Sequence, residues 1–287
     1  MNLFTPSTRK NNRMLLTLFL CVVLTALSVS CLAADTVRIN GSGSALDMLK
    51  PMIETYQKTN RDVRLHIEKP LGSSGAIKAL LAGALDIAVT SRALKPEEIA
   101  QGGQLREFGR TPLVMVTEKS VQKSNITTKE LEEIYSGGTS KWHNGETIRL
   151  VLRPREDIDT QILRGLSPGM DKAITASQSR PGMIVTVNDV DAYTTISKTP
   201  GGLGASGLTS LLTEKLPLNI LSLNGVTPSP MNLASGAYPL FKAISFVTGS
   251  RTSPEAHTFI TFVFSPQGRA IASKAGVLVT AGKKADK

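Results

Sequence analysis

Residues 37–92 read VRINGSGSALDMLKPMIETYQKTNRDVRLHIEKPLGSSGAIKALLAGALDIAVTSR, and the order of apolar and polar residues in this stretch decides the fold. Three short apolar segments, 37–39, 65–67 and 86–89, are typical of β-strands. Each of the first two is followed by a Gly/Ser loop and then by apolar residues at helical spacing. This order predicts an α/β protein with a parallel sheet and crossover helices.

The two Gly/Ser loops, residues 41–44 and 72–75, each lie between a predicted strand and the start of a predicted helix. Glycine allows close backbone approach, serine adds a hydroxyl, and the free N–H groups at a helix start favour an anion. A third polar segment, residues 90–92 (Thr-Ser-Arg), follows a strand at the sheet edge where open α/β folds bind ligands. We therefore expect a small-anion site; the alternative is that the serines only cap helices and the glycines only form turns.

The amino-terminal segment predicts export. The chain has 287 residues, with 33 Lys and Arg against 23 Asp and Glu, which gives a formal net charge of +10. Three of the basic residues fall within Met1–Arg13, and Met14–Ala34 contains no charge. A basic start, an apolar run and small residues at its end are typical of a secretory signal peptide, here cleaved after Ala33 or Ala34. We expect a periplasmic protein; an uncleaved anchor helix and a lipid anchor at Cys31 are the alternatives.

The sequence contains no motif of enzyme, metal or nucleic-acid chemistry. Cys21 and Cys31 both lie in the predicted leader, so we expect no disulfide in the rest of the chain. The histidines, His66, His143 and His257, have no partner at metal-ligand spacing. There is no nucleophile motif of the Gly-x-Ser-x-Gly type and no basic run with interleaved aromatic residues. The sequence therefore predicts no catalytic residue, no metal, no cofactor and no nucleic-acid partner.

Four stretches of the chain resemble one protein family. Residues 41–60, 71–98, 131–154 and 259–276 are similar to the phosphate-binding proteins of bacterial phosphate ABC transporters. The third stretch includes the sole tryptophan, Trp142, beside a glycine-rich turn. The resemblance implies a type 2 periplasmic-binding-protein fold, in which two hinged α/β lobes with mixed, mainly parallel sheets clamp a ligand in the cleft between them.

The same resemblance implies a domain organisation. We expect a signal peptide at residues 1–34, lobe 1 at residues 35–116, lobe 2 at residues 117–235, and a return to lobe 1 over residues 236–287. It also implies the residues that contact the ligand, namely Ser44, Ala45, Ser73, Ser74, Thr90, Ser91, Arg92, Arg153, Arg155 and Thr160.

The chain departs from the family in the second lobe. There the family has an arginine, a short spacer and Gly-Ser-Gly-Thr at the start of a helix, whereas this chain has Asp-Ile-Asp at 157–159 before Thr160. A carboxylate near a bound anion costs about 1 kcal/mol in water and about 4 kcal/mol at an effective dielectric of 20. Three interpretations follow. Arg153 and Arg155 neutralise these acids, the ligand is not a simple phosphate, or Asp159 only caps the helix.

These observations predict an exported, non-enzymatic solute-binding protein. It would capture a small oxyanion, phosphate first, and deliver it to the membrane subunits of an ABC transporter as a monomer. A sensor or receptor module that works without a transporter is one alternative. A phosphate-ester hydrolase on the same fold is the other, and it would need a general base near Ser73 or Ser91.

Overall fold

The computed structural model describes residues 35–280. The predicted signal peptide, its cleavage site and Cys31 lie outside the described residues, as does the segment 281–287. Among the described helices, none combines the length and the apolar character needed to cross a membrane.

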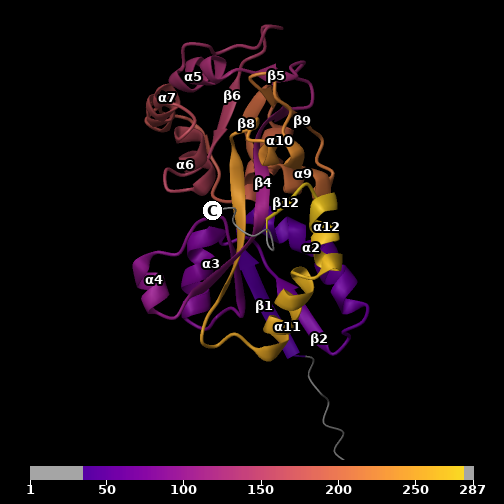
Figure 1. Cartoon of the computed structure of the whole chain (residues 1–287). Helices are drawn as coiled ribbons and strands as arrows, with labels where there is room; N and C mark the ends of the chain where they lie inside the picture. The colour runs from indigo at the N-terminus through magenta and orange to yellow at the C-terminus, as the bar shows by residue number, and fades with distance from the viewer. Residues whose placement is uncertain (1–34, 281–287) are drawn as a thin grey trace, which may run out of the picture. The chain divides into compact units, whose positions relative to one another are not determined.

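A mixed ten-stranded sheet forms the framework of the described chain, with the strand order β2-β1-β3-β11-β4-β8-β6-β7, and β9 and β12 paired to β4 (Figure 1). The strands are β1 (Asp35–Gly41), β2 (Val63–Ile67), β3 (Ile87–Thr90), β4 (Gln104–Glu118), β5 (Asn125–Ile126), β6 (Arg149–Leu152), β7 (Ile184–Val185), β8 (Gly202–Gly207), β9 (Leu218–Ile220), β10 (Ser222–Leu223), β11 (Phe241–Thr248) and β12 (Leu278–Val279). The short strands β5 and β10 pair with each other in a separate sheet.

Parallel pairs occupy the outer parts of the sheet. Strands β1 and β3 pair in parallel with Ile39 opposite Ile87, and β6 is parallel to both β7 and β8. The pairs formed by β4 and β11 are antiparallel. The mixed sheet and its covering helices confirm the predicted α/β class.

The helices α2 and α3 begin at the two Gly/Ser loops, as the sequence predicts. Helix α2 buries Leu46, Leu49 and Met52 at the expected helical spacing. The helices are α2 (Gly43–Gln57), α3 (Gly72–Leu81), α4 (Pro96–Ala100), α5 (Thr128–Ser136), α6 (Ile158–Arg164), α7 (Pro168–Gln178), α8 (Asp189–Lys198), α9 (Leu208–Glu214), α10 (Pro230–Ala234), α11 (Pro254–Val263) and α12 (Pro266–Lys274).

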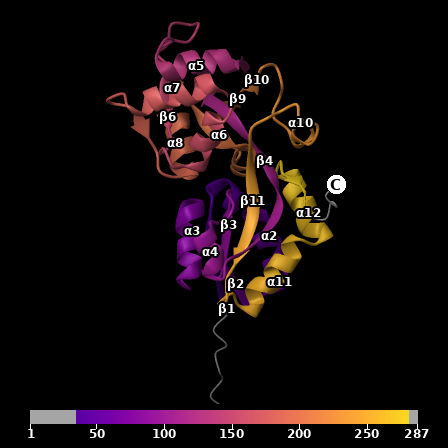
Figure 2. The same ribbon diagram turned by 60° about the vertical axis from the view of Figure 1, so that its left-hand side comes forward.

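Strand β4 joins the two halves of the sheet. Its first part, up to Pro112, pairs with β11, and from Leu113 to Thr117 it pairs with β8. At the point of exchange the Leu113 N–H donates to the carbonyl of Leu240, just before β11 begins. Figures 1 and 2 show β4 and β11 running between one group of elements with α3 and α11 and another with α5 and α7.

Each half has its own hydrophobic core. On the β1 side, apolar residues of β1, α2 and α11 pack together, and Phe108, Phe246 and Phe264 contact one another edge-on. On the β6 side, a second core contains Trp142, whose indole N–H donates to the carbonyl of Gly201 at 3.0 Å. Two separately packed halves joined by a few strands can change their relative orientation without losing either core.

Candidate functional site

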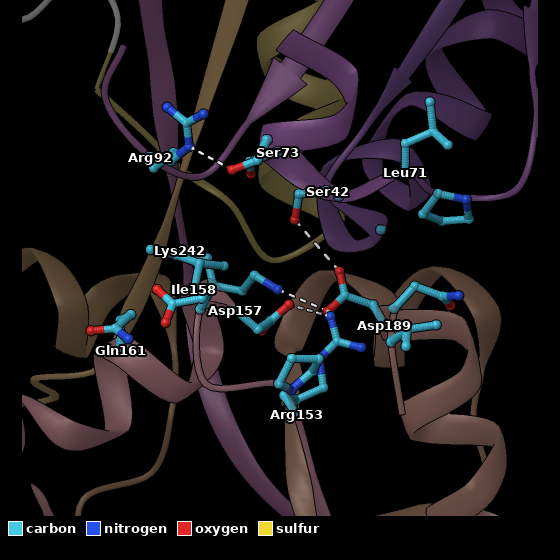
Figure 3. Close-up of a pocket in the computed structure, with 18 residues that line it drawn as sticks. Ser42, Leu71, Ser73, Arg92, Arg153, Asp157, Ile158, Gln161, Asp189 and Lys242 are labelled. Carbon is cyan, nitrogen blue, oxygen red and sulfur yellow. Dashed lines mark hydrogen bonds and ion pairs between the residues drawn. The ribbon is translucent and has the colours of Figure 1, made fainter. Parts of the chain in front are cut away.

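A cavity of about 280 Å³ lies where the two halves meet, at the carboxyl ends of β1, β3 and β6. Its walls come from the amino ends of α2 and α3 and from Lys242 of β11 on one side, and from α6 and the start of α8 on the other. Figure 3 shows Ser42, Ser73 and Arg92 facing Arg153, Asp157 and Asp189 across this space.

The α3 wall presents hydroxyls and backbone N–H groups. Gly72 starts the helix with a φ of +72°, a conformation that glycine adopts without strain. The Ser73 hydroxyl accepts a hydrogen bond from the Ser91 N–H at 2.9 Å, so its own hydrogen remains available. The Ser91 side chain is buried and its Oγ has no hydrogen-bond partner among the described residues. The Ser73 hydroxyl is therefore a donor available to an anion on this wall, whereas Ser91 does not line the cavity.

Arg92 lines the cavity but is already paired. Its guanidinium donates to both carboxylate oxygens of Glu98, at 2.8 and 2.6 Å, and its Nε donates to Ser74 Oγ at 3.1 Å. The hydrogen bonds from Arg92 hold the pKa of Glu98 below its usual value. Thr90 is buried behind Arg92, where its Oγ1 bonds to the Arg92 backbone, and it does not line the cavity. Arg92 thus supplies a cation whose charge Glu98 largely offsets.

The amino end of α2 is occupied by a carboxylate from the other half of the protein. The Ser44 N–H donates to Asp189 Oδ2 at 3.0 Å, and Ser42 Oγ lies 3.5 Å from the same oxygen. The Ser44 hydroxyl is buried and has no hydrogen-bond partner within residues 35–280, and Ala45 packs in the core away from the cavity. Asp189, which the sequence reasoning missed, is therefore the acceptor at this predicted anion site.

Arg153 reaches the cavity from the end of β6. Its Nη1 donates to the carbonyl of Thr186 at 3.1 Å, and its Nη2 donates to Asp157 Oδ2 at 2.5 Å. Its Nε is buried and has no partner among the described residues. Arg155, by contrast, is exposed and does not line the cavity. Of the two arginines predicted from the second lobe, the structure therefore brings only Arg153 to the cleft.

The two aspartates of the Asp-Ile-Asp segment have different roles. Asp157 is the N-cap of α6 and accepts from the Asp159 N–H at 3.0 Å, so the interpretation that Asp159 caps the helix is corrected. Asp159 instead lies 2.7 Å from the Lys242 ammonium. Thr160 is buried and donates to the carbonyl of Arg153 at 3.2 Å, outside the cavity lining.

Lys242 is the second functional residue that sequence reasoning missed. It is 1% exposed, and its ammonium lies 2.7 Å from Asp159 Oδ1 and 2.9 Å from Asp189 Oδ1. The available signal was a single lysine within the apolar β11 segment FKAISFVT, which requires a buried anionic partner. Such a pattern does not say where in the sequence the partner is.

The linked charges beside the cavity sum to a formal −1, because the buried Arg153 and Lys242 face the partly exposed Asp157 and the buried Asp159 and Asp189. Burial raises the pKa of Asp159 to about 7 despite the nearby Lys242. Burial also disfavours the charged form of Asp189, but Lys242 and Arg153 outweigh it and hold the pKa of Asp189 below its ordinary value. Asp189 therefore stays ionised, and Asp159 is the group that takes up a proton.

We expect this proton on Asp159 to appear in the pH dependence of stability. The folded carboxyl has a pKa of about 7 against an ordinary value of 3.8, so the folded protein binds the proton where the unfolded chain has lost it. The contribution of Asp159 to the free energy of unfolding should therefore fall as the pH rises from about 4 to about 7. Urea unfolding of the wild type and Asp159→Asn measures it, with half-exposed Asp171→Asn as the control. The prediction is contradicted if the free energy of unfolding changes with pH by the same amount in the wild type and in Asp159→Asn.

The described residues contain no cluster of three or more His, Cys, Asp or Glu side chains suited to a metal ion. The donors around the cavity are instead hydroxyls, helix-start N–H groups, arginines and a lysine, which are the groups that bind oxyanions in proteins.

Residues 30–267 match the family model of the PBP superfamily domain, so the chain belongs to this family. The predicted type 2 periplasmic-binding-protein fold is thereby confirmed.

Individual relatives and solved structures are consistent with this assignment. The chain is 28% identical over 264 residues to phosphate-binding protein PstS of Borreliella burgdorferi, a match that covers 88% of this chain and 94% of the relative. A Clostridium perfringens structure with bound phosphate has a TM-score of 0.72 at 20% identity and covers 85% of this chain and 99% of its own. The periplasmic molybdate-binding protein of Azotobacter vinelandii has a TM-score of 0.59 at 15% identity and covers 84% and 98%. The predicted resemblance to the PstS-type proteins is confirmed.

Proposed function

We propose that this protein is an exported solute-binding protein that captures a small oxyanion, with phosphate as the first candidate, and delivers it to an ABC transporter. The observation that favours this function is the α3 wall of the cavity. There the Ser73 hydroxyl and the Ser74 side chain line the same cavity that Arg153 reaches from the opposite half. A tetrahedral oxyanion would accept hydrogen bonds from both sides at once.

The comparisons support an oxyanion but differ in its identity. The Borreliella burgdorferi relative is named for phosphate, and the Azotobacter vinelandii protein of the same fold is named for molybdate. The acidic segment 157–159 also distinguishes this chain from the family pattern. Phosphate is favoured because the sequence match to the phosphate-named protein extends over nearly all of both chains.

The proposed mechanism is closure of the two halves around the ligand. The lobes would comprise residues 35–116 with 236–287, and residues 117–235, with the hinge where β4 exchanges β11 for β8. An oxyanion that bonds to the α3 wall and to Arg153 stabilises only the closed arrangement, because only there does it touch both lobes. Transporter subunits would then recognise the closed surface.

We further propose that the protein is exported through the amino-terminal leader and acts as a monomer. A lipid anchor at Cys31 is the alternative to a free protein. The sensor and the hydrolase stay as the alternative predictions.

Calorimetry on the mature protein tests the function. We expect phosphate to bind, and Ser73→Ala to weaken it by about 1–3 kcal/mol, since the substitution removes a hydrogen-bond donor to the anion. Ser136→Ala is the matched control because that hydroxyl is exposed and donates only to the carbonyl of Glu133. Sulfate, molybdate, phosphonates and small carboxylates complete the panel. If no oxyanion binds, or if Ser73→Ala leaves the affinity intact, the proposed function or its site is wrong.

A further inference from the structure

The Asp189 carboxylate is bound as a ligand would be. Its Oδ2 accepts from the Ser44 N–H at 3.0 Å and lies 3.5 Å from Ser42 Oγ, and its Oδ1 lies 2.9 Å from the Lys242 ammonium. The Arg153 guanidinium is 3.9 Å away. A backbone N–H at a helix start, a hydroxyl, a lysine and an arginine together form an oxyanion site. We call this group of donors the α2 subsite.

The α2 subsite is shaped around this side chain. Asp189 is 4% exposed, and a methyl group added at Gly43 would lie 2.6 Å from the Asp189 Cβ, so only glycine leaves room for it. Asp189 comes from α8, in the half of the protein opposite to α2. The contact is therefore a buried ion pair across the cleft rather than a local cap of one helix.

The donors of the α2 subsite are not exhausted by this contact. Arg153 Nε is buried, lines the cavity and has no partner among the described residues. Lys242 also lines the cavity, and its second partner, Asp159, lies behind it outside the lining. Cationic groups with this arrangement would bind an external anion of similar size if the Asp189 carboxylate were absent.

We infer that Asp189 is a specificity-determining residue, an internal carboxylate that fills the α2 subsite and restricts an external oxyanion to the α3 side of the cleft. The restriction is both steric and electrostatic. The carboxylate occupies the donors at the start of α2, and it places a fixed negative charge beside the remaining space. The part of the inference that concerns the natural ligand rests on the proposed function; the filling of the α2 subsite does not.

Chemical rescue tests the α2 subsite. Asp189→Ala keeps the Cβ and removes a group the size of formate. We expect the thermal midpoint of Asp189→Ala to fall below that of the wild type and to rise saturably with sodium formate, as binding to the folded state requires. The wild type and Asp191→Ala should respond to formate no more than to sodium chloride at equal ionic strength. Asp191 is the matched control because it lies in the same helix but is partly exposed, beside Lys69. If Asp189→Ala responds to formate only as to chloride, the inference is wrong.

Refolding of Asp189→Ala and phosphate binding by Asp189→Asn provide two further tests. If Asp189→Ala does not fold alone, refolding with formate must restore it, and failure to do so counts against the inference. Asp189→Asn keeps the shape and removes the charge, so we expect it to bind phosphate at least fivefold more tightly than the wild type. Unchanged or weaker phosphate binding by Asp189→Asn would overturn the specificity role. If the wild type binds no phosphate but formate rescues Asp189→Ala, the proposed function fails and the α2 subsite stands.

Discussion

Replacing Lys242 with methionine is expected to lower the free energy of unfolding by about 3–5 kcal/mol, the usual cost of breaking a buried ion pair by removing one partner. The methionine fills a similar volume, so the change tests charge rather than packing. It leaves Asp159 and Asp189, both almost fully buried, without their ammonium partner. Urea unfolding at neutral pH, followed by circular dichroism, measures the loss.

The control for Lys242→Met is the same substitution at Lys123. That ammonium lies 2.8 Å from Glu130, but both side chains are substantially exposed, so the pair contributes only about 0–1 kcal/mol. Adding Asp159→Asn to Lys242→Met should recover only a small part of the lost stability, because without the ammonium the buried Asp159 carboxyl takes up a proton at neutral pH. Equal losses at Lys242 and Lys123 would show that the buried network does not stabilise the fold.

The framework of the fold could be predicted from local sequence patterns. The strands expected at 37–39, 65–67 and 86–89 are β1, β2 and β3, each longer or shifted by a few residues at its ends. Apolar periodicity reports burial of one face, and the Gly/Ser loops mark the helix starts, so neither inference needs knowledge of distant contacts.

On the α3 side most of the site could be predicted from the sequence, whereas on the opposite side only Arg153 was predicted. Ser73, Ser74 and Arg92 lie at the ends of locally recognisable elements, and the structure brings them to the cavity. Asp189 and Lys242 come from α8 and β11, which are 53 positions apart in sequence and meet only through the packing of the two halves. Two residues that are brought together only by tertiary packing leave no local spacing pattern. For this reason the sequence did not reveal the Asp189–Lys242 pair.

Net charge also proved a poor guide to the cleft. Without the three basic residues of the predicted leader, the chain retains a formal excess of +7, yet Arg153, Lys242, Asp157, Asp159 and Asp189 beside the cavity sum to −1. The positive excess therefore resides elsewhere on the protein. Affinity for an anion must come from directed hydrogen bonds and from the placement of Arg153, since the total charge near the cavity opposes it.

We expect Arg153→Ala to weaken phosphate binding about 10²-fold, because one charge-assisted hydrogen bond from the unpartnered Nε to the ligand is worth about 1.5–3 kcal/mol. The loss has a second source: Asp157 loses its 2.5 Å partner and becomes a free negative charge at the cavity. Arg155→Ala is the matched comparison, since that side chain is exposed two positions away and does not line the cavity. Calorimetry with phosphate, after circular dichroism has shown that both variants are folded, gives the two affinities. A large loss in Arg155→Ala with little change in Arg153→Ala would mean that the segment 153–160 presents its other arginine to the ligand, and that the cleft in its bound form differs from the arrangement described above.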